Sequence, residues 1–155
     1  MAREEDKIDV INDLYDQFNV CQAIIYARSK KKVTWLGEKL IQQGHPVEFI
    51  HGELNQEDRD KVMKDFRNGT SRILISTDLL ARGIDIQQIS LVINYDLPNN
   101  LESYIHRIGR SGRYGRKGVA INFVVENDIK RLKEIEDYYQ THIEEMPVNF
   151  QEFLN

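Results

Sequence analysis

Residues 22–41 read QAIIYARSKKKVTWLGEKLI and contain two hydrophobic patterns, one directly after the other. The run from Ala23 to Ala27 is short and apolar, which predicts a buried strand. Ser29 is a favourable N-cap residue for a following helix, and Gly44 is favourable near its C-terminus. The expected inner face of this helix consists of apolar residues at helical spacing: Val33, Leu36, Leu40 and Ile41. Residues 22–41 therefore predict one strand–helix unit.

The rest of the chain repeats this alternation. Further helices are expected at residues 4–18, from Asn55 through Phe66, and from Asn127 to about Tyr139. Further strands are expected at four places: residues 47–50, 72–76, 91–94 and 119–125. Strands that alternate with helices across short connections predict an α/β fold with a parallel sheet and helices on both of its faces. A length of 155 residues fits a single domain over residues 1–155.

Composition excludes several classes of protein. The chain is 41% apolar and 30% charged, which is neither disordered nor fibrous. No apolar run is long enough to span a bilayer, so no membrane partner is expected. A single cysteine, Cys21, excludes an internal disulfide framework and favours a reducing, intracellular compartment. Residues 1–7 are too charged to open a secretory signal. No metal site is expected, because the histidines lack zinc-like spacing: His45, His51, His106 and His142.

The charge of the chain is distributed unevenly. The net charge of −4 does not by itself favour nucleic-acid binding. Residues 101–120, however, carry five basic residues and one acidic residue. Within them lies HRIGRSGR, residues 106–113, which we call the arginine segment. Glycine permits tight turns, and arginine presents a planar fork that fits phosphate, so this segment predicts a local anion site. The alternative is a solvated basic turn, or arginines paired with acids of the same domain.

Two other stretches follow expected strands, where ligands bind in parallel sheets. In residues 76–85, STDLLARGID, hydroxyl groups at a strand end can contact phosphate and Asp85 can accept from a ribose hydroxyl. The alternative is that Ser76 and Asp78 are helix caps and that Asp85 is a turn residue. In QEDR, residues 56–59, a helix N-terminus and Arg59 can meet one anion. The alternative there is an ordinary surface arginine. The sequence contains no G-x-x-x-x-G-K-[S/T] phosphate-binding loop.

Together these stretches resemble a known family. YIHRIGRSGRYGRKG (104–118), ISTDLLARGID (75–85), VINYDLP (92–98) and QEDR (56–59) resemble motifs in the C-terminal RecA-like domain of DEAD-box ATP-dependent RNA helicases. The resemblance spans nearly the whole chain, in the family's order and spacing. Within the family, the chain resembles the branch of eukaryotic initiation factor 4A and its nuclear, exon-junction relative.

The resemblance implies a role for each matching residue. Arg110 and Arg113 match arginine fingers that contact the γ-phosphate of ATP, and they would be catalytic. Gly83 and Asp85 join them in the nucleotide site, with Asp85 on the ribose. Two residues match positions that couple this site to the domain interface: His106 and Arg107. Four residues match the surface that binds the backbone of single-stranded RNA without reading its sequence: Gly52, Arg59, Thr77 and Arg82.

The resemblance also implies partners. ATP with Mg would be bound mainly by an N-terminal RecA-like domain that is absent from this chain, so the isolated domain is expected to be inactive. Other expected partners are RNA and a helical-repeat scaffold resembling initiation factor 4G. Translation initiation is the expected process, and the cytoplasm is favoured over the nucleus. The alternatives are an exon-junction or other RNA-remodelling member, a DNA-directed ATPase, or a protein-docking module that uses the acidic helices at 4–18 and 127–145.

Overall fold

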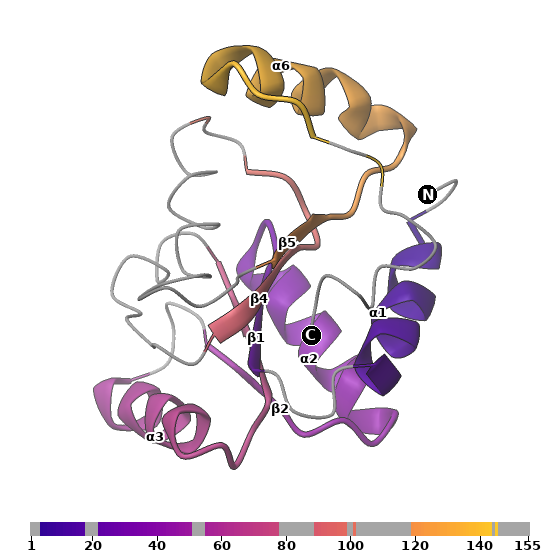
Figure 1. Ribbon diagram of the computed structural model, residues 1–155. Helices are drawn as coiled ribbons and strands as arrows, with labels where there is room; N and C mark the ends of the chain where they lie inside the picture. The colour runs from indigo at the N-terminus through magenta and orange to yellow at the C-terminus, as the bar shows by residue number, and fades with distance from the viewer. Residues whose placement is uncertain are drawn as a thin grey trace.

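The computed structural model describes residues 4–17, 22–50, 55–77, 89–98, 101, 119–143 and 145. Its strands form one five-stranded sheet, in the order β2-β3-β1-β4-β5 (Figure 1). The strand bounds are Gln22–Tyr26 for β1, Val47–Phe49 for β2, Ile73–Ser76 for β3, Ile89–Asn94 for β4 and Val119–Asn122 for β5. Every pairing in the sheet is parallel, as the alternation of strands and helices predicted.

Four α-helices accompany the sheet in the part of the chain that the structure describes. Their bounds are Asp6–Gln17 for α1, Lys30–Gln42 for α2, Gln56–Arg67 for α3 and Ile129–Tyr139 for α6. The last expected helix begins differently from its prediction, because a short 3-10 turn, η2 (Glu126–Asp128), precedes α6. The last expected strand is also shorter, since β5 ends at Asn122 rather than at residue 125. None of the described helices is long and apolar enough to cross a membrane.

The predicted helix caps are confirmed. The side chain of Ser29 accepts a hydrogen bond from the backbone N–H of Lys32 at 3.2 Å, at the start of α2. Asn55 accepts one from the backbone N–H of Asp58 at 2.8 Å, at the start of α3. Gly44 follows α2 with a φ of 86°, a left-handed conformation that costs glycine little. The ends of these helices are therefore determined by local sequence.

One residue of the predicted inner face of α2 is not buried. Val33, Leu36 and Leu40 are fully buried, but Ile41 is 50% exposed. Each helical residue advances by about 100° around the axis, so Ile41 lies at the edge of the stripe centred near Leu40. Gly37 takes the inner position instead, where it allows Phe49 of β2 to approach closely.

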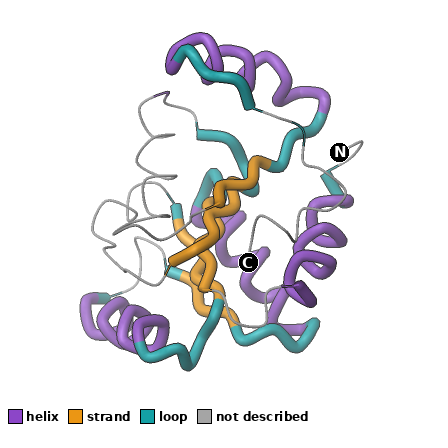
Figure 2. Tube along the Cα trace, viewed as in Figure 1, coloured by secondary structure: helices purple, strands orange, loops and turns teal. Residues whose placement is uncertain are grey.

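Helices cover both faces of the sheet, as predicted (Figure 2). Successive residues of a strand point to opposite faces, so Ile25 of β1 packs with α1 and α2, whereas Ile24 packs against Phe66 of α3. A third, smaller cluster lies under α6, where Ile135 packs with Leu97, which follows β4. Different helices therefore bury the two faces of the sheet: α1 and α2 cover one face and α3 covers the other.

The close contact at Gly37 generates a stability prediction. A Cβ atom at this position would overlap the ring of Phe49. We expect Gly37→Val to lower the free energy of unfolding by about 1–3 kcal/mol, the usual cost of overpacking a core. Chemical denaturation would measure the change. Glu38→Val, on the exposed side of the same helix, introduces the same side chain without the overlap and should cost less. Equal losses in the two variants would contradict the packing explanation.

Candidate functional site

The carboxyl ends of the strands lie side by side along one edge of the sheet. Tyr26 at the end of β1 pairs with Ser76 of β3 on one side and with Asn94 of β4 on the other. The hydrogen bonds continue past the strands, since Ala27 N–H donates to Ser76 O at 3.0 Å and Tyr95 N–H donates to Tyr26 O at 3.0 Å. This edge, which we call the carboxyl edge, is where a parallel sheet binds ligands.

The structure places two of the predicted site residues with respect to this edge. Thr77 follows β3 directly and therefore lies at the carboxyl edge. Arg59 lies in the first turn of α3, and its side chain is partly buried. The opposite end of α3 meets the start of β1, because the side chain of Gln22 donates a hydrogen bond to Phe66 O. The N-terminal turn that carries Arg59 is thus directed toward the same edge as Thr77.

The other predicted site residues lie outside the described residues, so their placement remains a prediction. They are Gly52, Arg82, Gly83, Asp85, His106, Arg107, Arg110 and Arg113. The ends of the segments that carry them are described. Ser76 and Thr77 precede residues 78–85, and Leu101 precedes the arginine segment. The described ends therefore give the place in the fold from which these segments start.

Sequence reasoning missed a buried charge beside this edge. Lys7 of α1 is only 1% exposed. Its ammonium group donates to Tyr95 O at 2.8 Å and lies 3.1 Å from the carboxylate of Glu4 and 3.6 Å from that of Asp96. The signal was present in the helical spacing, because Lys7 is four residues before Ile11 on the inner face of α1.

Asp96 connects this lysine to the segment that follows β1. One oxygen of its carboxylate faces Lys7, and the other accepts a hydrogen bond from the backbone N–H of Arg28 at 2.8 Å. The backbone N–H of Asp96 also donates to Tyr26 O at 3.3 Å. Segments that are far apart in the sequence, at residues 4–7, 26–28 and 95–96, are thereby held together at the carboxyl edge.

The same charges shift the pKa values of two groups. Partial burial raises the pKa of Glu4, but hydrogen bonds and positive charges from Lys7 and Lys32 outweigh it and hold this pKa below the ordinary value. Burial, with smaller contributions from the negative charges of Glu4 and Asp96, raises the pKa of the Tyr95 hydroxyl well above its ordinary range. The carboxylate of Glu4 is thus stabilised in its charged form, and Tyr95 remains neutral.

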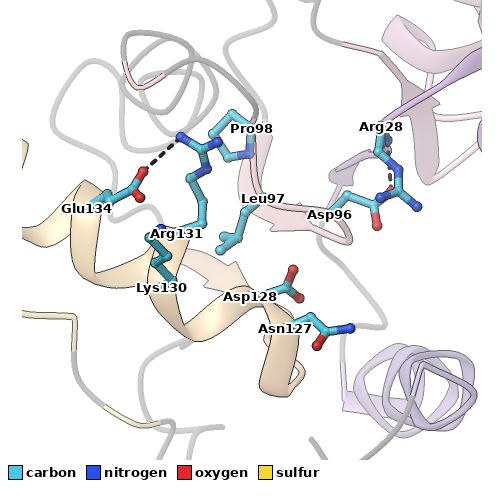
Figure 3. Close-up of a pocket in the computed structure, with 9 residues that line it drawn as sticks. All are labelled: Arg28, Asp96, Leu97, Pro98, Asn127, Asp128, Lys130, Arg131 and Glu134. Atoms are coloured by element: carbon cyan, nitrogen blue, oxygen red, sulfur yellow. Dashed lines mark hydrogen bonds and ion pairs between the residues drawn. The ribbon is translucent and has the colours of Figure 1, made fainter.

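A hollow of about 320 Å³ opens between the segment that follows β4 and the start of α6 (Figure 3). Its lining residues are Arg28, Asp96, Leu97, Pro98, Asn127, Asp128, Lys130, Arg131 and Glu134. Three of these are basic and three are acidic. The acids are engaged within the protein: Asp128 accepts from Val125 N–H at 3.1 Å, and Glu134 pairs with Arg131 at 3.1 Å. The hollow therefore has no excess of one charge, and no group of metal ligands is found among the described residues.

A parallel five-stranded sheet with helices on both faces and polar residues at its carboxyl edge defines the class of doubly wound α/β domains. The profile of the helicase conserved C-terminal domain matches residues 6–115. The chain belongs to this family, as a C-terminal RecA-like domain of the DEAD-box type.

Curated relatives support this assignment. The ATP-dependent RNA helicase eIF4A of Coccidioides immitis is 57% identical over 99% of this chain and 39% of its own length. Eukaryotic initiation factor 4A of Caenorhabditis elegans is also 57% identical, over 99% of this chain and 38% of its own length. The chain thus spans about two fifths of the length of these relatives. Its predicted likeness to initiation factor 4A is confirmed.

A solved structure agrees. Dbp5 of S. cerevisiae, bound to RNA and ADP BeF3, is 44% identical, with a TM-score of 0.86 over 92% of this chain and 38% of that chain. The RecA-like fold predicted from the sequence motifs is therefore confirmed.

The position of Glu4 generates a prediction about pH. Because folding lowers its pKa below the ordinary value of 4.5, the charged carboxylate contributes stability above that pH and loses it as pH falls through the folded pKa. We expect Glu4→Gln to lower the free energy of unfolding by about 1 kcal/mol or less at pH 7, since the group is partly exposed. The difference from the wild type should vanish in acid. Urea denaturation at several pH values would measure it, with Glu38→Gln as a control for the loss of one exposed acid. A difference that grows in acid would contradict this assignment.

Proposed function

We propose that the chain is the C-terminal half of an ATP-dependent RNA helicase that completes the ATP site and supplies part of the RNA-binding surface. The observation that carries this proposal is that Thr77 follows β3 at the carboxyl edge and that the N-terminal turn of α3, which holds Arg59, is directed toward the same edge. Both residues match RNA-contacting positions of the family. Dbp5, which is 44% identical, is bound to RNA and ADP BeF3 in its solved structure.

The RNA-binding surface would recognise the backbone and not the bases. A helix N-terminus favours an anion, and Arg59 adds a full positive charge in the first turn of α3. The Thr77 hydroxyl can hydrogen-bond a phosphate or a 2′-hydroxyl. Gly52 and Arg82 belong to the same proposed surface. Contacts of this kind read charge and sugar, so binding to single strands would be independent of sequence.

The ATP site would be completed by the arginine segment. In this proposal Arg110 and Arg113 approach the γ-phosphate, while Asp85 and Gly83 contact the ribose side of the nucleotide. Planar guanidinium groups match phosphate oxygens and stabilise the charge that spreads over them during phosphoryl transfer. ATP with Mg, when bound, supplies the phosphoryl group, and the N-terminal RecA-like domain would hold most of it.

Closure of the two domains would join the sites. His106 and Arg107 would couple the nucleotide to the interface between the domains, so that binding of ATP and RNA favours the closed state. RNA held across both domains in a bent path cannot remain in a straight duplex. Closure would therefore separate a few base pairs locally.

The cellular role proposed is translation initiation in the cytoplasm. It is supported by the 57% identity to relatives named for initiation factor 4A. A helical-repeat scaffold resembling initiation factor 4G is the protein partner proposed for this role. An exon-junction or other RNA-remodelling role is the alternative within the family. The test is to compare how strongly RNA and DNA each stimulate the ATPase activity of the full-length protein. Stronger stimulation by RNA would distinguish the initiation role and the RNA-remodelling role from that of a DNA-directed ATPase.

Protein docking is a second candidate function. The E. coli DEAD-box protein SrmB, 32% identical and with a TM-score of 0.88, is bound to the regulator of ribonuclease activity A in its solved structure. This domain can in the same way serve as a docking module in addition to its part in catalysis. Capture of the initiation-factor scaffold by the isolated 155 residues, without RNA or ATP, would support this candidate.

The first functional prediction concerns the isolated chain. We expect the 155 residues alone to hydrolyse no ATP measurably, because the sequence lacks a phosphate-binding loop. Single-stranded RNA should still bind weakly, with an affinity that falls steeply as salt rises. Steady-state ATPase assays and RNA titrations at several salt concentrations would measure both. RNA-stimulated turnover by this chain alone would refute the proposed division between two domains.

The second functional prediction separates the two kinds of arginine in the full-length protein. Arg110→Ala and Arg113→Ala should each reduce turnover by roughly two to five orders of magnitude, as expected for arginine fingers. Arg59→Ala should instead weaken RNA binding and leave RNA-free ATPase nearly intact. The loss of one phosphate contact should lower the salt slope of RNA binding by about 0.7.

Arg67 provides the matched control for Arg59. It lies in the last turn of α3, at the end of the helix away from the carboxyl edge. Arg67→Ala removes the same charge from the same helix and should leave RNA affinity unchanged. Equal losses for Arg59→Ala and Arg67→Ala would show only a general effect of charge and would contradict the proposed RNA path.

A further inference from the structure

A second hollow, of about 460 Å³, lies between the start of α1, the first two turns of α2 and the segment that follows β4. We call it the tryptophan hollow, and its lining includes Glu4, Glu5, Lys31, Lys32, Trp35 and Tyr95. Its walls are mainly apolar, and its size is typical of a site for a small ligand. The hollow lies at the carboxyl edge, because Tyr95 follows β4 directly and α2 follows β1.

Two aromatic side chains form part of the wall of the tryptophan hollow. Tyr95 is almost fully buried, whereas Trp35 is 47% exposed although it is the largest side chain on α2. An aromatic ring that lines a hollow and stays half exposed offers a surface on which a flat group can stack. The exposed part of Trp35 is therefore available to a ligand.

Positive charge is concentrated where α2 begins. Residues 28–32 read RSKKK, and the first turn of α2 contains no acidic residue. Lysines are unfavourable in the first turn of a helix unless a negative charge compensates them. The ammonium of Lys32 is compensated by the carboxylate of Glu4, at 3.3 Å. Lys31 is exposed, lines the hollow and makes no ion pair with any residue that the structure describes.

The walls of the tryptophan hollow are held in place by contacts within the domain. The ammonium of Lys32 lies 5.5 Å from the ring centroid of Trp35 and 5.4 Å from that of Tyr95. Glu4, which pairs with Lys32, also pairs with buried Lys7 at 3.1 Å. These contacts connect both rings to the core, so the hollow is preformed with Lys32 already in place.

We infer that the tryptophan hollow binds one nucleotide of single-stranded RNA, with its base stacked on Trp35 and its phosphate beside Lys31. The inference rests on the proposed function, since it extends the RNA path from Thr77 across the end of β1. The two strands leave the sheet side by side there, because Ala27 N–H donates to Ser76 O at 3.0 Å. Every base has an aromatic face, so stacking keeps the binding independent of sequence.

A nucleotide fits the charges of the hollow better than an acidic peptide does. An acidic peptide would bring like charges next to Glu4 and Glu5, which line the same space as Lys31. A base instead brings exocyclic amino groups, which can donate to a carboxylate, while its phosphate meets the lysine. A free nucleotide has the same groups but none of the further backbone contacts that RNA makes at Arg59 and Thr77 in the proposed function.

Tryptophan fluorescence tests this inference directly, because Trp35 is the only tryptophan of the chain. The 155-residue chain is titrated at low salt with single-stranded oligouridylate and with oligoadenylate. Both should cause a saturable loss of Trp35 emission, since a stacked base quenches an indole ring. The midpoint should equal that of RNA binding measured by the anisotropy of labelled RNA. Adenosine monophosphate and polyglutamate, at the same concentrations, should leave the emission nearly unchanged.

Two substitutions with matched controls on α2 separate stacking from charge. Trp35→Leu keeps an apolar side chain and should weaken RNA binding by at least about fivefold, the smaller effect expected for the loss of one stacked base. Ile41→Ala is its control, because Ile41 is 50% exposed on the same helix and does not line the hollow. Lys31→Ala should lower the salt slope of RNA binding by about 0.7, whereas Lys39→Ala, in the last turn, should not.

The outcomes distinguish this inference from the proposed function. If labelled RNA binds without a change in Trp35 emission, or if Trp35→Leu and Ile41→Ala bind RNA equally well, the inference is wrong although the proposed function stands. Quenching by adenosine monophosphate at the same midpoint as RNA would assign the hollow to a free nucleotide and overturn it. Quenching by polyglutamate but not by RNA would assign the hollow to an acidic protein and also overturn it. If the chain binds no RNA even at low salt, the proposed RNA-binding role itself fails, and the role of the hollow fails with it.

Discussion

The backbone hydrogen bonds that β1 makes on both of its sides are the constraint on which the rest of the structure depends. β1 pairs in parallel with β3 and with β4, and its central residues Ile24 and Ile25 are fully buried against the two faces. Because all pairings are parallel, the described strands end at one edge. Any group that follows a strand must therefore lie near the groups that follow its neighbours.

Buried Lys7 holds together the segments that meet at this edge. Removing the ammonium of Lys7 from water is costly, and the cost is offset by Tyr95 O, Glu4 and Asp96, which surround it. The contacts of Lys7 serve mainly to fix the arrangement of the backbone, because they join α1 to the segments that follow β1 and β4. Hydrophobic residues of similar size would fill the space without orienting Asp96, and the backbone N–H of Arg28 depends on that carboxylate.

The strand order divides the edge between two tasks in the proposed function. β2 and β3 lie together on one side of β1, and the segments after them carry Arg59 and Thr77. β4 and β5 lie on the other side, and the chain between them carries the arginine segment. One row of strand ends can thus present basic groups to an RNA backbone and to a nucleotide without mixing the two.

By itself the sequence determined the elements and the motifs. Caps such as Ser29 and Asn55, the apolar periodicity and the spacing of HRIGRSGR all depend on neighbours within a few residues, and both caps are confirmed. Only the tertiary structure decided the strand order, the exposure of Ile41 and the burial of Lys7. Periodicity gives the direction in which a side chain points but not what it meets there. The partners of Lys7 come from residues 4 and 95–96, up to 89 positions away, and only packing brings them together.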